Sequence, residues 1–316
     1  MMNRHCITLS ALAVAFGLTA VPGVRGEHEK ELLKTKARVA YLTPDGKILA
    51  AASNDNVRLV YLDIKKSRLL AKKYAPIYLS PDGKVLTVMR DDGSAVTLHD
   101  VPTAAARGQV PLPPTAAIAF CVAPAGKFCV YGTLKDLVVV EVATRKETHT
   151  FKDLGGQPWA ASFSPDGKYL ACGTGSRKYQ VHVWDMARGK HVRTFDNMPN
   201  VVHSVAFSQD SKLLAASSED VVKVWDVAAG KEVRAIRGPK DKLMRGLAFG
   251  NNGKVLASAC SNGIVTLWDM ASGKALDSIK IGVEAHRVSL SDNGKVLAVT
   301  ADDQMARVYD VSAVIK

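Results

Sequence analysis

Cysteine is scarce in this sequence, with five residues in a chain of 316. The four that follow residue 26 are too few to form a disulfide framework. Aromatic residues are also few, at 6%, yet hydrophobic residues make up 47% of the chain. That hydrophobic fraction excludes an intrinsically disordered protein, and 24 glycines are too few for a collagen-like one.

Motifs of the common catalytic classes are absent. The sequence has no phosphate-binding loop, no GxGxxG, no HExxH, no CxxC and no GxSxG nucleophile elbow. We therefore expect a protein that is not an enzyme, with no cofactor and no metal site.

Long apolar runs are absent after residue 26, and the only one lies before it. Residues 6–24 carry no charge and follow Arg4 and His5, and small residues stand at suitable cleavage positions up to Gly26. This pattern predicts a signal peptide over residues 1–26, and hence an exported protein that is periplasmic or secreted. The alternative is an uncleaved membrane anchor, because 19 uncharged residues can just span a bilayer. We expect no membrane span in the mature chain, residues 27–316.

The charge balance is basic, with 42 Lys and Arg against 30 Asp and Glu and a formal net charge of +12. Cleavage after residue 26 would remove Arg4 and Arg25 but no acid, which leaves +10. The excess of positive charge therefore belongs to the folded part of the chain.

One five-residue turn recurs seven times along the chain, at intervals of 37 to 44 residues. In each copy Gly, or Ser in one case, precedes Lys. The copies are residues 43–47 (TPDGK), 80–84 (SPDGK), 123–127 (APAGK), 164–168 (SPDGK), 208–212 (SQDSK), 250–254 (GNNGK) and 291–295 (SDNGK). Each turn lies between two apolar runs, which is the pattern of a β-hairpin.

A third strand follows every hairpin, and in the last four units it ends in an aromatic residue and an aspartate. These strands are residues 181–185 (VHVWD), 222–226 (VKVWD), 265–269 (VTLWD) and 306–310 (ARVYD). A Gly-Lys turn such as Gly230-Lys231 then leads into a fourth strand. Each unit of about forty residues therefore contains four short strands.

Four strands per unit, with Trp-Asp closing the third, resemble the WD-repeat β-propeller family. The resemblance covers nearly all of residues 29–316 and is strongest in the last four units. In the first three units, residues 62–63 (LD), 99–100 (HD) and 140–141 (VE) stand near the Trp-Asp position. The resemblance implies an all-β fold, a single seven-bladed β-propeller of four-stranded antiparallel blades.

The seventh unit lacks a fourth strand, because the sequence ends soon after Asp310. Residues 29–35 (EKELLKT) precede the first inner strand as residues 230–234 (GKEVR) precede the sixth. We expect residues 29–35 to close the ring as the outer strand of the last blade, within one domain over residues 27–316.

The Trp-Asp residues follow the period of the fold, so we assign them structural roles. The aromatic rings should fill gaps between blades and the aspartates should end strands. These residues are Trp184, Asp185, Trp225, Asp226, Trp268, Asp269, Tyr309 and Asp310. In the family a His, a Ser or Thr, an Asp and the Trp form a hydrogen-bonded tetrad. Here it is mostly broken, since Lys178 and Asn262 stand in its Asp position and Asp303 fits that position best.

Cys121 and Cys129 flank one hairpin. By the register of the other hairpins, Cys121 should face Phe128 and Cys129 should face Phe120, so a disulfide would need a one-residue slip. We expect free, buried thiols here and at Cys172 and Cys260. The alternative is a disulfide between Cys121 and Cys129, formed after export.

In this architecture the loops that lead into inner strands share one face of the ring with the loops between second and third strands. That face collects cations: Lys34, Lys36, Arg38, Lys72, Lys73, Arg177, Lys178, Arg237, Lys240, Lys242 and Arg245. Acids there are expected to be few, chiefly Glu219, Asp241 and Glu284, and the cations to be unpaired. The alternative is a merely solvated face with a basic bias.

A second pattern concerns the slot four residues before the bulky end of each inner strand, near the mouth of the central channel. In chain order the slot holds Arg38, Ala75, Ile118, Trp159, His203, Arg245 and His286. Two arginines, two histidines and an indole favour an acidic or planar ligand, through bidentate pairing and stacking. The two histidines lie two blades apart, so they indicate no metal site.

The resemblance implies a non-catalytic interaction scaffold that binds a protein or another acidic partner on its basic face. We expect a monomer, and these partner-binding residues: Arg38, Trp159, Arg177, Lys178, His203, Lys240, Lys242, Arg245 and His286. The competing hypothesis is an exported propeller hydrolase or lactonase that uses the same mouth. Specific nucleic-acid binding is not expected, because the sequence lacks an aromatic stacking series and because export conflicts with it.

Overall fold

The computed structural model describes residues 30–73, 75–90, 92–116 and 120–315. The predicted signal peptide at residues 1–26 lies outside the described residues, and so do Glu29 and Ile118.

Five of the seven repeated turns are held by a hydroxyl group. In the turn at residues 80–84, Ser80 Oγ donates to Asp82 Oδ1 at 2.6 Å and accepts the Val85 amide at 2.9 Å. Gly83 takes a φ of 68°, a conformation that favours glycine. The same hydroxyl is supplied elsewhere by Thr43, Ser164, Ser208 and Ser291. The turn therefore forms from local chemistry and fixes each hairpin.

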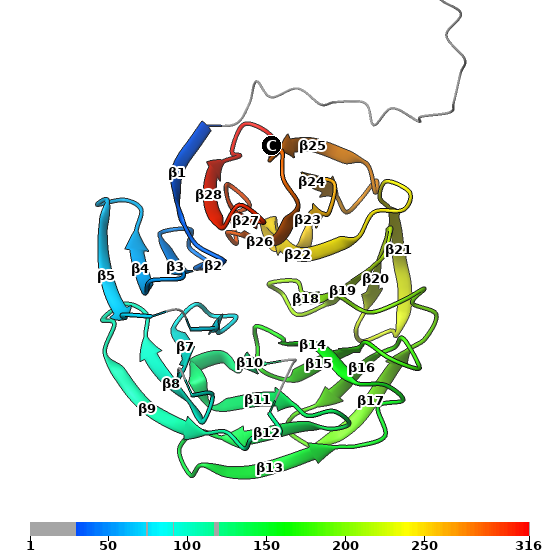
Figure 1. Ribbon diagram of the computed structural model, residues 1–316. Coiled ribbons are helices and arrows are strands. Elements are labelled where there is room, and N and C mark those ends of the chain that lie inside the picture. The colour runs from blue at the N-terminus through cyan, green and yellow to red at the C-terminus, as the bar shows by residue number, and fades with distance from the viewer. Residues whose placement is uncertain (1–29, 74, 91, 117–119, 316) are drawn as a thin grey trace, which may run out of the picture.

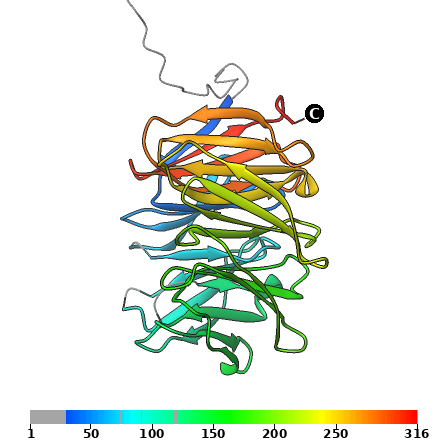
Figure 2. The same ribbon diagram turned by 90° about the vertical axis from the view of Figure 1, so that its right-hand side faces the viewer.

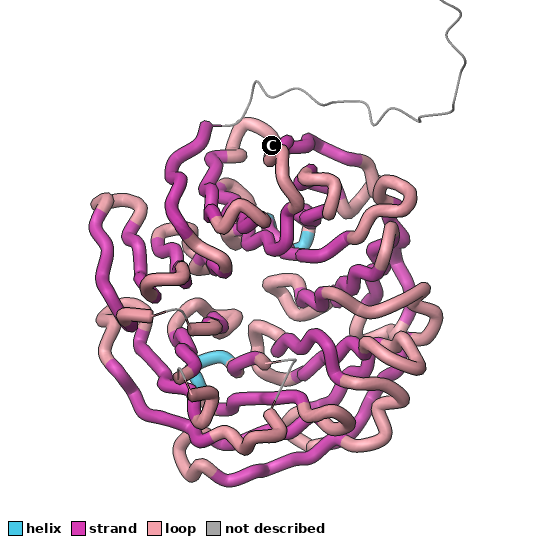
Figure 3. Tube along the Cα trace, viewed as in Figure 1, coloured by secondary structure: helices cyan, strands magenta, loops and turns pink. Residues whose placement is uncertain are grey.

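The other two turns begin with Ala123 and Gly250, which have no hydroxyl. In each turn a backbone amide donates a hydrogen bond to the carbonyl of the residue three positions earlier. Each turn also contains a short 3₁₀ helix (Figure 3). These helices are η1 (Pro124–Gly126) and η2 (Asn251–Gly253).

Each hairpin begins a blade of four antiparallel strands in sequential order. Blade 1 contains β2 (Val39–Leu42), β3 (Ile48–Ala52), β4 (Val57–Tyr61) and β5 (Lys66–Ala71). Blade 2 contains β6 (Ile77–Leu79), β7 (Val85–Met89), β8 (Ala95–Asp100) and β9 (Ala106–Pro111). Blade 3 contains β10 (Cys121–Val122), β11 (Phe128–Gly132), β12 (Leu137–Glu141) and β13 (Lys146–Phe151).

The remaining blades follow the same plan. Blade 4 contains β14 (Pro158–Phe163), β15 (Tyr169–Thr174), β16 (Val181–Asp185) and β17 (Lys190–Phe195). Blade 5 contains β18 (Ser204–Phe207), β19 (Leu213–Ser218), β20 (Val221–Asp226) and β21 (Lys231–Arg237). Blade 6 contains β22 (Met244–Gly250), β23 (Val255–Cys260), β24 (Ile264–Asp269) and β25 (Ala275–Lys280).

Blade 7 is the one blade built from both ends of the described chain. It contains β26 (Ala285–Leu290), β27 (Val296–Ala301) and β28 (Met305–Asp310), and β1 (Lys30–Lys36) is its outer strand. Figure 1 shows β1 beside β28, with the chain then passing to β2 of blade 1. Within the described residues the closing strand spans Lys30–Lys36, and Glu29 of the predicted range 29–35 lies outside them.

The seven blades are arranged in a ring (Figure 1), and Figure 2 shows the ring from its edge. The predicted fold class, an all-β seven-bladed propeller closed by an N-terminal strand, is confirmed. The predicted position of the Trp-Asp pair in blade 1 was wrong. The Trp-Asp position there is Val60-Tyr61, because Ile48 pairs with Tyr61 as Tyr169 pairs with Asp185 in blade 4. Residues 62–63 lie beyond it, in the following turn.

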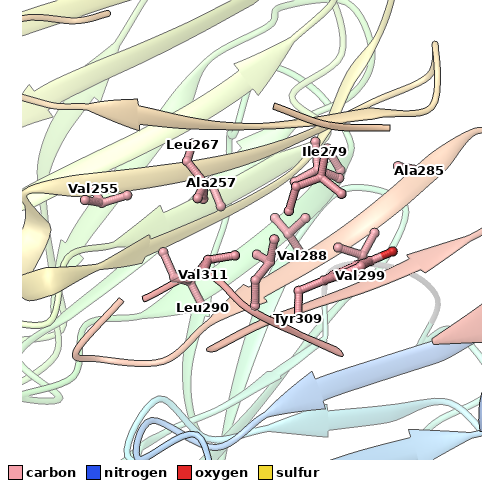
Figure 4. Close-up of a cluster of buried hydrophobic side chains, with 13 residues drawn as sticks. Val255, Ala257, Leu267, Ile279, Ala285, Val288, Leu290, Val299, Tyr309 and Val311 are labelled. Atoms are coloured by element: carbon pink, nitrogen blue, oxygen red, sulfur yellow. The ribbon is translucent and has the colours of Figure 1, made fainter. Parts of the chain in front are cut away.

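Apolar side chains fill the gaps between neighbouring blades. Figure 4 shows the cluster between blades 6 and 7, to which Tyr309 and Leu267 contribute. In blade 4 the Trp184 indole stacks on Phe151 of the preceding blade, with ring centroids 4.6 Å apart. In blade 5, Trp225 stacks on Phe195 in the same way and at the same distance. An outer-strand ring of one blade thus packs on the indole of the next.

The aspartates of the Trp-Asp positions accept amide protons from the turns that follow them. Asp185 accepts from Ala187 and Arg188, and Asp269 accepts from Ala271. Asp226 and Asp310 make the equivalent bonds to Ala229 and Ser312. Each carboxylate therefore ends its strand and fixes the turn to the outer strand.

Of the family's tetrad, the structure keeps a fragment in blade 6, where Trp268 Nε1 donates to Ser258 Oγ at 2.8 Å. Asp303, the best fit to the Asp position, instead forms a two-pronged ion pair with Arg307. That pairing lowers the pKa of Asp303.

Outer-strand arginines also join neighbouring blades. Arg234 on β21 donates to the carbonyls of Met270 and Ala271 of blade 6, at 3.2 and 2.6 Å. Arg193 on β17 donates to Ala228 of blade 5 at 3.0 Å. A Cβ on Gly273 would lie 3.0 Å from Arg234, so glycine leaves room for the side chain. These contacts supply polar links between blades where the tetrad is broken.

We expect Arg234→Met to lower the free energy of unfolding by about 1.5–3 kcal/mol, the usual contribution of hydrogen bonds to a charged group. The matched control is Arg237→Met on the same strand, whose side chain is 78% exposed beside Asp220. This control should change stability by less than about 0.5 kcal/mol. Urea denaturation followed by circular dichroism measures both values, and equal effects would contradict a role for the Arg234 link.

The hairpin register around Cys121 and Cys129 differs from the prediction. Cys121 lies opposite Val130 and Cys129 lies opposite Val122, because the hairpin closes with the Ala123 amide bonded to the Phe128 carbonyl. The two thiols therefore point to opposite faces of the blade. All four cysteines of the described residues are buried and free, and burial raises the pKa of Cys129 to about 12.

Candidate functional site

The inner strands of all seven blades line the central channel, which encloses about 930 Å³. The channel wall includes five of the seven predicted slot residues: Arg38, Trp159, His203, Arg245 and His286. Ala75, the slot residue of blade 2, is buried in the apolar core instead. The inner-strand register thus brings five side chains of three kinds, two Arg, two His and one Trp, from five blades to one channel.

Arg245 is not the unpaired cation that its position in the sequence suggested. Its Nε forms an ion pair with Glu284 Oε1, across the boundary between blades 6 and 7. Arg237 likewise lies 3.8 Å from Asp220. The prediction was wrong for Arg245 because Glu284 reaches it only across a blade boundary, and for Arg237 because Asp220 reaches it only once β20 and β21 have paired.

The two channel histidines differ in their surroundings. His203 is half-buried, and its pKa is lowered by burial first and then by the charge of Arg245, against a smaller opposing effect of Glu219. His203 is therefore uncharged at neutral pH. His286 Nε2 lies 2.5 Å from Asp302 Oδ1, so it already has an acidic partner at the mouth.

Trp159 offers a flat apolar surface at the channel wall. Its side chain is 39% exposed, which is high for an indole. A Cβ on Gly175 would lie 2.7 Å from the Trp159 ring, so the indole rests directly against the backbone of the loop between β15 and β16. That support holds the ring in one orientation while part of it faces the channel.

Arg287 and Tyr41 are channel residues that the sequence analysis missed. Arg287 Nη1 donates to Tyr41 Oη at 3.0 Å, and its guanidinium carbon lies 5.8 Å from the Tyr41 ring centroid. The slot pattern followed one position per inner strand, whereas Arg287 is the next residue after the slot. An irregularity in the pairing of β26 between Ala285 and Arg287 explains why neighbouring residues both reach the channel.

Arg38 follows β1 and begins the path into blade 1. Its Nη1 lies 3.5 Å from Asn54 Oδ1, at the long limit of a hydrogen bond. Arg38 also lines a second cavity of about 300 Å³ at the seam between blades 7 and 1, with Lys36, Asp55 and Asp303. The seam therefore carries charges of both signs.

The other four predicted partner-binding residues lie on loops of the same face, outside the channel wall. Arg177 and Lys178 belong to the loop between β15 and β16, and Lys240 and Lys242 to the loop between β21 and β22. Within the described residues no ion pair is found for any of the four. The structure thus divides the predicted partner-binding residues into a channel set, which lines the channel wall, and a loop set, which lies on loops outside it.

The expectation that acids are few on this face was wrong. The loops between second and third strands bring several there: Asp55, Asp92, Asp136, Glu219, Asp220, Asp302 and Asp303. Aspartate is favoured in such tight loops because its carboxylate caps the local backbone, as Asp92 does for Ser94. The face is therefore mixed in charge, with local basic loops.

In the described part of the chain, no group of three or more His, Cys, Asp or Glu side chains is arranged to hold a metal ion. Over the same residues, no helix has the length and hydropathy needed to cross a membrane.

Comparisons with known proteins match the same repeats. A family model described as "WD domain, G-beta repeat" matches residues 145–185 and 189–226, and one described as "Anaphase-promoting complex subunit 4 WD40 domain" matches residues 236–292. Each of the first two matches runs from the outer strand of one blade to the Trp-Asp pair of the next.

Two curated relatives are similar over part of their length. "WD repeat-containing protein SL1-17" of Schistosoma mansoni is 30% identical over 132 residues, which cover 42% of this chain and 44% of the relative. "Pre-mRNA-processing factor 19 homolog 2" of Arabidopsis thaliana is 38% identical over 64 residues, which cover 20% of this chain and 12% of the relative. The chain thus spans less than half the length of either relative.

Proposed function

Because this chain belongs to the WD-repeat family of β-propellers, we propose that it is a non-catalytic scaffold that acts outside the cytoplasm and binds a protein partner at the channel mouth. WD-repeat proteins are generally protein-interaction scaffolds. The location outside the cytoplasm rests on the apolar segment at residues 1–26.

One observation supports the mouth as the binding site. Five blades each direct a polar or aromatic side chain to one channel, from strands that are fixed by their pairing. Binding to such a rigid surface orders little new chain and so costs little conformational entropy. Trp159 offers a stacking surface, and Arg38 and Arg245 offer guanidinium groups that recognise carboxylates.

The nature of the partner follows from the loops beside the mouth. Lys240 and Lys242 are exposed next to Arg245, whose charge is already opposed by Glu284. An acidic segment of a partner would therefore contact the two lysines while it enters the channel past Trp159. The competing proposal of a hydrolase or lactonase requires carboxylates ready for catalysis, and the two acids that contact the predicted binding residues Arg245 and His286, Glu284 and Asp302, are each paired with a base.

The test compares two triple variants with the same change in charge. The first variant reverses the charge of three residues at the mouth: Arg38→Glu, Lys240→Glu and Lys242→Glu. The control reverses the charge of three lysines in the repeated turns on the opposite face: Lys47→Glu, Lys84→Glu and Lys254→Glu. Partners retained from envelope extract are identified, and the affinity of the purified pair is measured at low and high salt. We expect the mouth variant to bind about tenfold or more weakly, with a reduced salt dependence, and the control to bind as the parent does.

Equal loss of binding in both variants would show a non-specific effect of charge, and unchanged binding in the mouth variant would place the site elsewhere. If the parent retains no partner, the enzyme proposal gains support, and substrate screening follows.

A further inference from the structure

Three polar atoms in the outer half of blade 4 form a small triangle. His182 belongs to β16, and His191 and Thr194 belong to β17, two neighbouring strands at the perimeter in Figure 1. The distance from His182 Nδ1 to His191 Nε2 is 3.4 Å. Thr194 Oγ1 lies 3.0 Å from His191 Nε2 and 3.3 Å from His182 Nδ1.

A β-bulge creates this arrangement. Residues three apart on a regular strand point to opposite faces of the sheet. In β17 an irregularity between the partners of Val183 and Trp184 makes Val192 an extra residue, so His191 lies opposite Trp184 and Thr194 lies opposite His182. Because His182 and Trp184 share a face, His191 and Thr194 now share it as well.

Hydrogen bonds to the backbone determine which nitrogen of each imidazole carries the proton. His182 Nε2 lies 3.0 Å from the Leu154 carbonyl oxygen, which can only accept, so that nitrogen carries the proton and Nδ1 presents a lone pair. Burial lowers the pKa of His191, and a hydrogen bond to the backbone of Arg193 opposes this effect, as expected when the ring is the donor. Its Nε2 then also presents a lone pair.

Two nitrogen atoms that each carry a lone pair therefore lie 3.4 Å apart, and the Thr194 hydroxyl has one proton to offer to them. Within the described residues, one of the two nitrogens is left without a donor. A cation between them would satisfy both nitrogens at once.

The triangle has the dimensions of one face of a tetrahedral coordination shell. Ligand atoms about 2.0–2.1 Å from an ion, at tetrahedral angles, lie about 3.3–3.4 Å apart. We propose that His182 Nδ1 and His191 Nε2 bind a divalent transition-metal ion, with Thr194 Oγ1 and water completing its shell. Imidazole nitrogen is suited to Cu²⁺, Zn²⁺ and Ni²⁺, and of these Cu²⁺ should bind most tightly.

The surroundings of the triangle suit such an ion. The carbonyl behind His182 is the kind of outer partner that orients a metal-binding imidazole. His182 is 6% exposed, whereas His191 is exposed, so the ion can enter from solvent onto a preformed ligand. The Asp196 carboxylate is near enough to act on the charge of His182. With two imidazoles and open positions, the site would hold an exchangeable ion rather than a permanent one.

Trp184 provides the measurement. Its ring centroid lies 5.7 Å from that of His182 and 5.8 Å from that of His191, and Cu²⁺ quenches a neighbouring indole. We expect Cu²⁺, added to the full chain without an affinity tag, to quench tryptophan emission and to saturate at one equivalent. The electron paramagnetic resonance spectrum of that complex should show two imidazole nitrogens. Zn²⁺ should reverse the quenching when it is added in excess.

Three variants test the assignment. His191→Gln changes an exposed side chain and should weaken the quenching by at least tenfold, while His149→Gln on β13 is the matched control and should leave it unchanged. His182→Gln should act as His191→Gln does, and the His191→Gln result stands alone if that variant does not fold. The proposal is overturned if the parent shows no saturable quenching, or if His191→Gln binds Cu²⁺ as tightly as the parent.

Discussion

Deletion of residues 30–36 is expected to lower the unfolding midpoint of the ring by about 10–20 °C. These residues form β1, which pairs with β28 through six residue pairs. At about 1 kcal/mol for each hydrogen bond, the loss approaches 5 kcal/mol, a large part of the stability of a typical protein. Leu33 also packs against the core between blades 7 and 1, so the deletion exposes apolar surface as well.

The control for this deletion restores the strand from the other end. In a circular permutant, residues 30–36 follow β28 through a turn copied from residues 226–231 of blade 5, which places the same strand against the same edge. Thermal unfolding followed by circular dichroism should show the midpoint recovered. If the deletion variant unfolds at the midpoint of the parent, closure by β1 contributes no stability.

The fold was predictable because each repeated turn carries its own chemistry. In five of the seven copies, the hydroxyl, the Asp or Asn and the Gly or Ser form the turn from local bonds alone, and the other two turns close through backbone bonds. Seven such turns fix seven hairpins, and the apolar runs beside them fix which side chains reach the core. Register failed where the local pattern was weak, at Val60-Tyr61 in blade 1 and around Cys121 in blade 3.

The channel set was also predictable in part, because one slot per inner strand repeats with the blade. Contacts between residues far apart in the sequence were not. Arg245 and Glu284 are 39 residues apart and meet only across a blade boundary, and Arg287 reaches Tyr41 from the opposite end of the chain. A pattern within one unit contains no information on such pairs. The bulge that brings His182 and His191 together was missed for a different reason, because it lies within one blade but regular strand alternation does not predict an extra residue.

Trp225→Ala is expected to lower the free energy of unfolding by about 3–5 kcal/mol, the usual cost of removing a large buried aromatic side chain. The Trp225 side chain is 3% exposed and its ring is nearly parallel to that of Phe195, at 15°. The substitution would open a cavity between blades 4 and 5, and rigid strands on both sides limit how far the cavity can collapse.

Trp159→Ala is the matched control, because it removes the same side chain from the channel wall, where 39% of it is exposed. We expect its cost to stay near 1 kcal/mol while binding of the partner weakens. Urea unfolding followed by far-ultraviolet circular dichroism measures both variants without relying on the tryptophans that they lack. Similar losses of stability would mean that the blade interfaces do not depend on their indoles. The opposite pattern, a stable Trp225→Ala and an unstable Trp159→Ala, would place the structural ring at the mouth and remove the basis for Trp159 as a binding surface.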